Sequence, residues 1–315
     1  MRQILLHIGL HKTATSYLQN VFRKNPCQFV QNELFPLVVY ARDIGIARGA
    51  VNRPHPVINI PASFRKNIIV SQEGLGIVYF CGDSSGDLRL FQKTCAKLTK
   101  DIFPEAKIFL TLREPIKWIF SIYNQCIKEG AFYDFRGFIK KNHEILIDCL
   151  NIMDLLNIWG AYYDDFLVLP MEMLKDDFQL FFDILEDFAG FKLPVRKVAQ
   201  EVLNPSISEI KLRLLRKFNE VIYLFKKYCA PSHRFPPQTD AAIHVIRFAM
   251  RMSLEHDHPI LEEKLNFLKE YPSCNISEDH ITADIKAKIK ANLMDFFNVT
   301  QTFFGYDAHY LSTLG

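Results

Sequence analysis

The sequence lacks a long hydrophobic run and a strong excess of charge of either sign. Of its 315 residues 49% are hydrophobic and 23% charged, and the net charge is only +3. No stretch reaches the roughly 20 apolar residues that a membrane-spanning helix needs. The start carries one charge, Arg2, and its short apolar run has no small-residue site like that of a signal peptide. We therefore expect a cytoplasmic protein, or one whose anchor lies outside this sequence.

The small net charge also excludes a global positive field of the kind that nucleic-acid-binding proteins carry. We expect no nucleic acid as partner, and any anion must bind at a local site. The seven cysteines are scattered, and no two of them form a CxxC pair. Their spacing favours buried, reduced thiols over a disulfide framework or a zinc site. The segment HDHP at 256–259 offers no third ligand, so we expect no metal.

Short apolar runs rich in β-branched residues alternate with helical patterns through the first two thirds of the chain. The expected strands are 3–8, 67–71, 107–112 and 166–170, and the expected helices are 15–25, 86–101, 115–128, 134–160 and 173–189. Near-continuous apolar strands of this kind are typical of a parallel sheet buried on both faces. The alternation predicts an α/β fold with a doubly wound parallel sheet.

Beyond Ser206 the strand pattern stops and long amphipathic helical patterns follow. They cover 206–228, 239–256 and 279–297. The Pro-rich joints between them are too short to be free linkers. We expect one domain over 1–315, with an α/β core at 1–195 and a mainly helical annex at 196–315. The stretch 40–66 has no clear period, and so long a loop in a compact domain is usually functional.

The first polar motif lies where the strand at 3–8 gives way to a helix. Gly9 is followed by a lysine and by three hydroxyl residues, which are Lys12, Thr13, Thr15 and Ser16. A helix N-terminus has unpaired N–H groups and a partial positive charge, so a tight turn before it can hold an oxyanion. A lysine and hydroxyl donors add further contacts to phosphate oxygens. The alternative is that Thr15 only caps a helix and Lys12 is a solvated loop cation.

The motif differs from the phosphate loop of nucleoside triphosphatases. That loop needs a Gly directly before the Lys, whereas two residues separate Gly9 from Lys12. The other strands also lack a following Asp for magnesium, because Gln72 and Glu73 follow one of them and Arg113 follows another. A P-loop kinase is therefore a less favoured alternative.

A second polar motif follows the strand at 107–112. Arg113 stands at the strand's end, Pro115 begins a helix, and Ser121 lies two turns into it. Carboxyl ends of parallel strands face the ligand crevice, where an arginine fork and a hydroxyl can hold a second phosphate. The alternative is that Arg113 is paired with Glu114 or another carboxylate.

Together the two motifs resemble the sulfotransferase family that uses 3′-phosphoadenosine 5′-phosphosulfate (PAPS). In that family the first loop, a Lys-Ser/Thr-Gly-Thr-Thr run after a strand, binds the 5′-phosphosulfate. The second, Arg-x-Pro with a downstream Ser and Tyr, binds the 3′-phosphate. Lys12-Thr13-Ala14-Thr15-Ser16 is similar to the first, and Arg113-Glu114-Pro115 with Ser121 and Tyr123 to the second. Looser likenesses to bacterial carbohydrate-type members extend over most of the chain.

The resemblance implies a P-loop-like nucleotide-binding core that takes PAPS as cosubstrate and needs no metal. It implies transfer of the sulfuryl group to a hydroxyl of a carbohydrate or glycolipid. The residues expected to bind the nucleotide are His11, Lys12, Thr13, Ala14, Thr15, Ser16, Arg113 and Ser121. His11 is expected to line the loop and orient Lys12, and Lys12 to stabilise charge on the leaving nucleotide.

The chain departs from the family at Ala14, where the usual residue is glycine. If the position needs a positive φ, a methyl group there costs about 1 kcal/mol or more. Either the turn is compatible with a right-handed backbone, or nucleotide affinity is weakened. This leaves open a second function, a catalytically impaired protein of the same fold that binds the desulfated nucleotide (PAP) or another anion.

Sulfuryl transfer to a hydroxyl needs a base for the acceptor proton. Glu73 directly follows the strand at 67–71, and a Glu in this neighbourhood often serves as base in the family. A partly dry crevice is expected to raise the pKa of its carboxyl group. The alternatives are that Glu73 only stabilises a helix start, or that His55, between two prolines in the loop, is the base.

The sequence indicates the acceptor less specifically than it indicates the nucleotide. The loop arginines Arg42, Arg48, Arg53 and Arg65 can recognise an acidic sugar, but scattered arginines are more often solvated or paired. The helix at 206–228 has an apolar face and several lysines. Core packing is its expected use, with peripheral contact to a membrane that holds a lipid-linked acceptor as an alternative.

Overall fold

The structure is a computed structural model that describes residues 2–24, 28–47, 54–58, 67–77, 86–193, 208–229, 277–300 and 303–315. The chain divides into two compact units. The first comprises Met1–Trp118, Glu144–Glu201 and Ala283–Gly315, and the second comprises Ile119–His143 and Val202–Thr282. The final 33 residues, which the sequence prediction assigned to a helical annex, thus group with the sheet. The predicted boundary near residue 195 stays a prediction.

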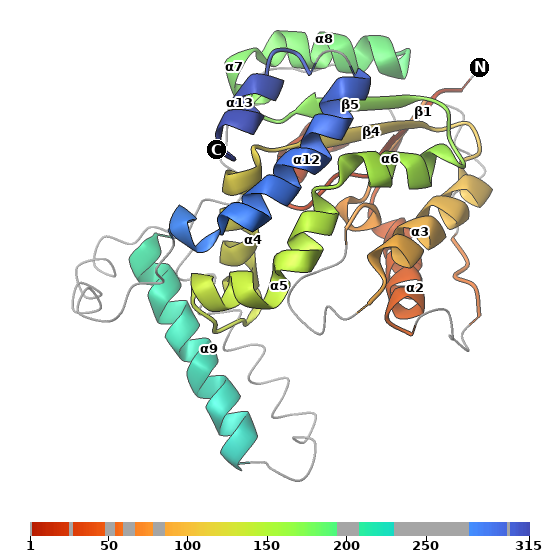
Figure 1. The fold of residues 1–315 in the computed structure, drawn as a ribbon. Coiled ribbons are helices and arrows are strands. Elements are labelled where there is room, and N and C mark those ends of the chain that lie inside the picture. Colours follow the sequence, from red (N-terminus) through yellow and green to blue (C-terminus); the bar gives the residue numbers. More distant parts are fainter. Residues whose placement is uncertain are drawn as a thin grey trace. The chain divides into compact units, whose positions relative to one another are not determined.

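A parallel sheet forms the centre of the first unit (Figure 1). Its strands are β1 (Ile4–His7), β2 (Gln28–Val30), β3 (Ile68–Ser71), β4 (Lys107–Leu112) and β5 (Phe166–Pro170). They are arranged in the order β2-β3-β1-β4-β5, and every pair is parallel. All residues of β1 and β3 are buried, because helices cover both faces, which is why these strands read as continuous apolar runs. The prediction of a doubly wound α/β sheet is confirmed.

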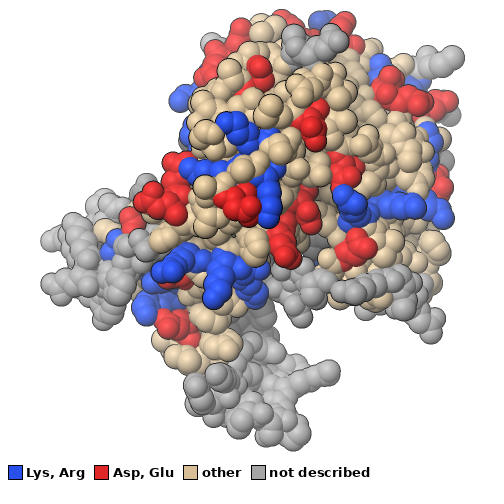
Figure 2. Space-filling model, viewed as in Figure 1, with Lys and Arg blue, Asp and Glu red and all other residues tan. Residues whose placement is uncertain are grey.

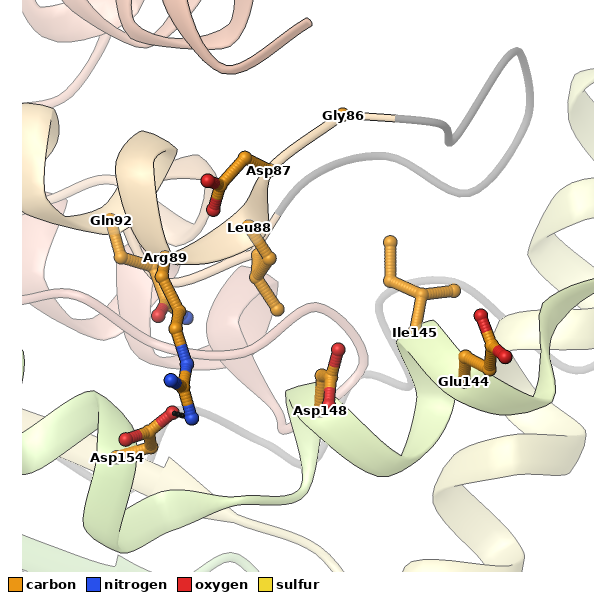
Figure 3. Close-up of a pocket in the computed structure, with 9 residues that line it drawn as sticks. All are labelled: Gly86, Asp87, Leu88, Arg89, Gln92, Glu144, Ile145, Asp148 and Asp154. Carbon is orange, nitrogen blue, oxygen red and sulfur yellow. Dashed lines mark ion pairs between the residues drawn. The ribbon is translucent and has the colours of Figure 1, made fainter. Parts of the chain in front are cut away.

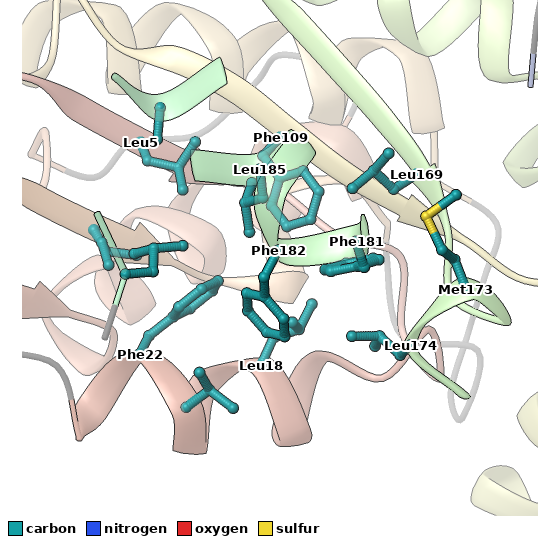
Figure 4. Packing of buried hydrophobic residues seen from close by; sticks show 14 residues of the cluster. Leu5, Leu18, Phe22, Phe109, Leu169, Met173, Leu174, Phe181, Phe182 and Leu185 are labelled. Atoms are coloured by element: carbon teal, nitrogen blue, oxygen red, sulfur yellow. The ribbon is translucent and has the colours of Figure 1, made fainter. Parts of the chain in front are cut away.

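One face of the sheet is covered by α1 (Thr15–Arg23), α7 (Met173–Asp176) and α8 (Phe178–Ala189). Leu5, Phe109 and Leu169 come from neighbouring strands and meet apolar side chains of these helices (Figure 4). Phe22 and Phe181 are fully buried in this cluster. Burying such side chains stabilises the fold by about 1.5–3 kcal/mol each. The packing fixes the start of α1 against the sheet.

Other helices of the first unit lie on the opposite side of the sheet (Figure 1). These are α3 (Leu88–Ile102), α6 (Ile152–Gly160) and α12 (Ala283–Thr300), with α6 in contact with both of the others. Short elements complete the unit: η1 (Asn32–Leu34), α2 (Phe35–Ile46), η2 (Glu73–Leu75) and α13 (Asp307–Ser312). The hydroxyl group of Tyr310, in α13, lies 3.3 Å from the carbonyl of Leu112 at the end of β4.

Two predicted helices are each divided in the structure. The pattern over 134–160 forms α5 (Phe135–Cys149) and α6, because the side chain of Asn151 accepts a hydrogen bond from the Asp154 N–H and starts a new helix. The pattern over 173–189 forms α7 and α8, since Asp177 caps α8 in the same way. These boundaries were wrong in the prediction because both caps interrupt an unbroken apolar period.

Several observed elements were not predicted, among them β2 and α2. Strand β2 has only 3 residues, too few for a visible pattern. Helix α2 includes 40–46, which the sequence analysis placed in a long loop. Most of the rest of that loop, with Arg48, Arg53 and Arg65, lies outside the described residues, as does the predicted helix 239–256.

The second unit contains most of α4 (Pro115–Glu129), the first part of α5, and α9 (Glu209–Cys229) with the short η4 (Glu278–His280). The amide of Asn219, in α9, donates to the carbonyls of Ile127 and Ala131 at 2.8 and 2.9 Å. Leu212 and Leu215 are buried, as the expected core packing requires, but Lys211 and Arg216 are buried too. Membrane contact by this helix stays a prediction.

On the face drawn in Figure 2, Lys and Arg side chains are interspersed with Asp and Glu side chains. This distribution agrees with the small net charge of +3. In the part of the chain that the structure describes, each helix is either too short or too polar to cross a bilayer. Cys95, Cys126 and Cys149 are buried free thiols, as their spacing predicted.

Candidate active site

Four strand ends of the first unit meet at one edge of the sheet. The strand order reverses at β1, with β2 and β3 on one side of it and β4 and β5 on the other. In open α/β sheets ligands bind outside the carboxyl ends of the strands at such a reversal. The segments that leave β1, β3, β4 and β5 at this edge carry most of the polar residues selected from the sequence.

The loop between β1 and α1 has an unusual backbone. Lys12 and Ala14 have positive φ values of 68° and 63°, and Ala14 is the N-cap of α1 without a side-chain hydrogen bond. The alternative in which Thr15 caps the helix was therefore wrong, as was the option of a right-handed turn at Ala14. Each such residue costs about 1–2 kcal/mol. Backbone strain of this kind persists where the surrounding structure enforces it, and it clusters at functional sites.

Hydrogen bonds from the interior hold this loop in place. The Thr13 hydroxyl donates to the Leu10 carbonyl at 2.6 Å, and Thr111 of β4 donates to the Thr13 carbonyl at 2.8 Å. The indole N–H of Trp118 donates to the His11 carbonyl at 2.8 Å. Thr13 is fully buried, so its hydroxyl supports the loop. This corrects the prediction that each hydroxyl of the motif serves as a donor to phosphate.

Gly9 is needed where the loop passes over β1. A Cβ atom at this position would lie 2.8 Å from Nε2 of His7, whose ring also approaches Ser71 Oγ through Nδ1 at 2.9 Å. His7 is fully buried, and burial lowers its pKa to about 4, an effect that the charge of Glu73 opposes. The neutral His7 ring is thus a core residue of β1.

Arg113 joins the second motif to the first. Its Nη1 donates to the Lys12 carbonyl at 3.3 Å, although the two residues are 101 positions apart. Burial lowers the pKa of Arg113, and the charges of Glu172, Glu114 and Tyr310 oppose this shift. The guanidinium group is half-buried and has carboxylates nearby, so it stays charged, and its hydrogen bond holds it at the loop.

Glu114 has a role of its own beside Arg113. Its carboxylate accepts hydrogen bonds from the N–H groups of Ile116 and Lys117 at 2.7 and 3.2 Å and so caps α4. The alternative in which Glu114 serves as the ion-pair partner of Arg113 is therefore not how the structure uses this carboxylate. The guanidinium of Arg113 instead donates to the loop after β1.

Glu73 follows β3 and faces the same loop. One carboxylate oxygen lies 3.4 Å from Nδ1 of His11. Burial raises the pKa of Glu73. The hydrogen bond and charge of His11, the charge of Lys12 and the hydrogen bond of Thr15 lower it, and together they outweigh burial, so the net shift is downward. The expectation of a raised pKa was wrong, because the cationic side of the loop outweighs the dry surroundings.

For two of the predicted site residues, Ser121 and His55, the described contacts include none with this group. Ser121 lies in α4 within the second unit, so its predicted contact with a ligand of Arg113 stays a prediction. His55 is exposed in the short described segment 54–58, where its ring centre lies 5.4 Å from that of Tyr40. Arg42 pairs with its neighbour Asp43 at 3.7 Å. Ser16 is half-buried in the first turn of α1.

Four residues at the site were not selected from the sequence for the part they play. Thr111 and Trp118 support the loop, and Glu172 and Tyr310 lie beside the backbone of Arg113. Glu172 had a usable signal, because it follows β5 as Glu73 follows β3. Tyr310 had none, since nothing in its local sequence relates it to a strand end 198 residues away.

A separate pocket of about 300 Å³ lies between the start of α3 and the helices α5 and α6 (Figure 3). Its lining includes the carboxylates of Asp87, Glu144, Asp148 and Asp154, and Arg89 forms an ion pair with Asp154 at 2.6 Å. The excess of negative charge is unfavourable for a phosphate ligand. This pocket therefore differs in chemistry from the edge that carries Lys12 and Arg113.

The strain at Ala14 gives a first testable prediction. Replacing Ala14 with glycine should raise the free energy of unfolding by about 1 kcal/mol, because glycine adopts φ near 63° without a steric cost. The midpoint of urea denaturation measures this. The matched control is Ala161→Gly at the exposed end of α6, where φ is −67° and glycine should destabilise. A lower midpoint for Ala14→Gly would contradict the left-handed backbone.

What this chain shares with known proteins is a likeness of fold. No model of a protein family matches the chain, and no curated protein matches it. Among solved structures the fold is similar to that of a sulfotransferase from Alicyclobacillus acidocaldarius. The sequence identity is 17%, the match covers 71% of this chain and 91% of that chain, and the TM-score is 0.42.

Proposed function

We propose that this protein transfers a sulfuryl group from PAPS to a hydroxyl group of a carbohydrate or glycolipid acceptor. The observation that carries the proposal is the contact between the two motifs, in which Arg113 donates to the carbonyl of Lys12. Through it the guanidinium of Arg113 lies at the loop that carries Lys12, so two cationic residues from different strand ends share one edge of the sheet. Such a pair suits a ligand with two separated phosphate groups.

The loop after β1 is the proposed site of the 5′-phosphosulfate. The first N–H groups of α1 are directed out of the helix, and Lys12 adds a positive charge beside them. The guanidinium of Arg113 is the proposed ligand of the 3′-phosphate, to which its fork geometry is suited. Ser121 is proposed as a second donor to that phosphate, by the resemblance of its motif. The saccharide or glycolipid as acceptor depends on the same resemblance.

The transfer step needs a base and a group that stabilises the leaving phosphate. The acceptor oxygen attacks sulfur, and the new O–S bond forms as the bond from sulfur to the 5′-phosphate oxygen breaks. The acceptor proton passes to the Glu73 carboxylate, whose lowered pKa keeps it ionised at neutral pH. Charge on the departing phosphate is stabilised by Lys12 and the loop N–H groups. His55 stays an alternative base.

A catalytically impaired protein that binds PAP is the second candidate. Two observations favour it. The left-handed backbone of Ala14 raises the strain of the loop, and the Thr13 hydroxyl, which donates to the Leu10 carbonyl, is lost as a donor to phosphate. Calorimetry with PAP, followed by transfer from PAPS to a panel of saccharides and glycolipids, separates the two candidates. Binding without transfer favours the second, and no binding of PAP contradicts both.

Glu73→Gln tests the role of the proposed base. We expect the rate of transfer to fall by about 10²–10⁴-fold, the usual contribution of a general base. PAP affinity should not fall, because the substitution removes a negative charge from the anion site and removes no hydrogen-bond donor. The control is Glu105→Gln, an exposed carboxylate in the turn before β4. Equal rates for Glu73→Gln and wild type would exclude Glu73 as the base.

The pH dependence follows from the direction of the same shift. The pKa of Glu73 in the folded protein lies below its ordinary 4.5, so the base is ionised above that value. The transfer rate should therefore show no loss due to Glu73 until the pH falls below about 4.5. Its contribution to stability is likewise present above the unfolded pKa and lost as the pH falls through the folded pKa.

A further inference from the structure

Glu172 lies directly beside the backbone of Arg113. It follows β5, and its Oε1 accepts a hydrogen bond from the Glu114 N–H at 3.1 Å. The N–H of the preceding residue, Met171, donates to the Leu112 carbonyl at 2.7 Å and extends the pairing of β4 with β5. The segment after β5 is thus fixed to the peptide groups on both sides of Arg113.

Tyr310 completes this arrangement from the C-terminal helix. Its hydroxyl donates to the other carboxylate oxygen of Glu172 and lies 3.3 Å from the Leu112 carbonyl. The ring is fully buried, with the ring centre of Phe303 at 5.4 Å in an edge-to-face arrangement. A buried tyrosine hydroxyl is rarely left without a partner, and here both partners flank one residue.

The contacts form a continuous path across the edge of the sheet. Tyr310 in α13 bonds Glu172 after β5, Glu172 bonds the peptide next to Arg113 after β4, and Arg113 bonds the loop after β1. The charge of Glu172 acts on the half-buried guanidinium, and it is the strongest of the charges that oppose the effect of burial on Arg113. Tyr310 is buried and Glu172 and Arg113 are half-buried, so their hydrogen bonds have a larger effect on one another than they would in water.

We propose that Glu172 and Tyr310 are positioning residues that hold Arg113 at the site of the 3′-phosphate. The identity of the ligand, a 3′-phosphate, rests on the proposed function. Neither residue needs to touch the nucleotide, because each acts through the backbone and charge of Arg113. A guanidinium that is fixed before binding loses less entropy when it engages a phosphate.

The first measurement reports on Arg113 without any nucleotide. In protein labelled with ¹⁵N-arginine, the Nε–H resonance of Arg113 is assigned by its loss in Arg113→Lys. We expect it to shift in Tyr310→Phe and in Glu172→Gln. It should stay in place in the matched control Tyr306→Phe, whose hydroxyl donates to Asp176 at 2.8 Å. An unmoved resonance in both Tyr310→Phe and Glu172→Gln overturns the positioning role, whether or not PAP binds.

The second measurement compares PAP with adenosine 5′-phosphate, which lacks the 3′-phosphate, by calorimetry. Tyr310→Phe should lower PAP affinity by about tenfold, near the low end for a hydrogen bond to a charged group, and leave adenosine 5′-phosphate within about twofold. Equal losses for both nucleotides, or no loss for either, overturn the assignment to the 3′-phosphate. Wild-type protein that binds no PAP overturns the proposed function, while the resonance shift still decides the positioning role.

Discussion

Lys12→Gln is expected to lower the rate of sulfuryl transfer by about a hundredfold or more. Lys12 lies in the loop at the start of α1, and in the proposed reaction its positive charge stabilises the negative charge that develops on the leaving 5′-phosphate. Glutamine keeps the length of the side chain but carries no charge. Since neither residue relieves a positive φ of 68°, the strain of the loop should be similar in both proteins.

Steady-state rates at saturating PAPS measure this effect, and thermal unfolding tests whether the fold is kept. The control is Lys93→Gln, an exposed lysine of α3 whose loss should leave the rate unchanged. A Lys12→Gln protein with wild-type turnover would remove Lys12 from the transfer step. It would leave the anion site to the backbone N–H groups of α1.

Arg113→Lys is expected to weaken PAP binding by about 10–100-fold and to leave adenosine 5′-phosphate binding nearly unchanged. Lysine keeps the charge but cannot make the two parallel hydrogen bonds of a guanidinium fork, and a hydrogen bond to a charged group is worth about 1.5–3 kcal/mol. The lysine also cannot keep the geometry of the hydrogen bond that Arg113 donates to the Lys12 carbonyl. Some loss of loop order should accompany the loss of affinity.

The control for this variant is Arg89→Lys, which changes the exposed ion pair with Asp154 in the acidic pocket. Calorimetry with both nucleotides on both variants gives the comparison. If Arg113→Lys and Arg89→Lys bind PAP equally well, Arg113 does not hold the 3′-phosphate. The contact between the two motifs would then serve only to support the loop.

The sequence predicted where polar chemistry lies along the chain but not how each group is used. Lys12, Glu73 and Arg113 each follow an apolar strand, and because parallel strands end at one edge, their proximity could be expected. The direction of the Glu73 pKa shift could not, since it depends on the distance to His11. Likewise, the sequence could not show that the Thr13 hydroxyl accepts a hydrogen bond from Thr111, a β4 residue 98 positions away.

Ala14 shows the limit of reading a turn from residue types. Alanine ordinarily avoids the left-handed region, whereas the glycine usual at this position in the family adopts it readily, so the sequence left both conformations open. The structure has the left-handed one, with φ at 63°. Hydrogen bonds from Thr111 and Trp118 to the backbone of the loop enforce it, and the one from Thr111 depends on the pairing of β1 with β4.

The sequence by itself determined the α/β class, the four longer strands and the polar residues that end them. A buried parallel strand requires an unbroken apolar run, and the first charged or polar residues mark its end. The tertiary structure alone decided the strand order, the strained loop and the path from Tyr310 through Glu172 to Arg113. These depend on contacts between residues up to 198 positions apart, and the local periodicity of a sequence does not indicate which distant segments pack together.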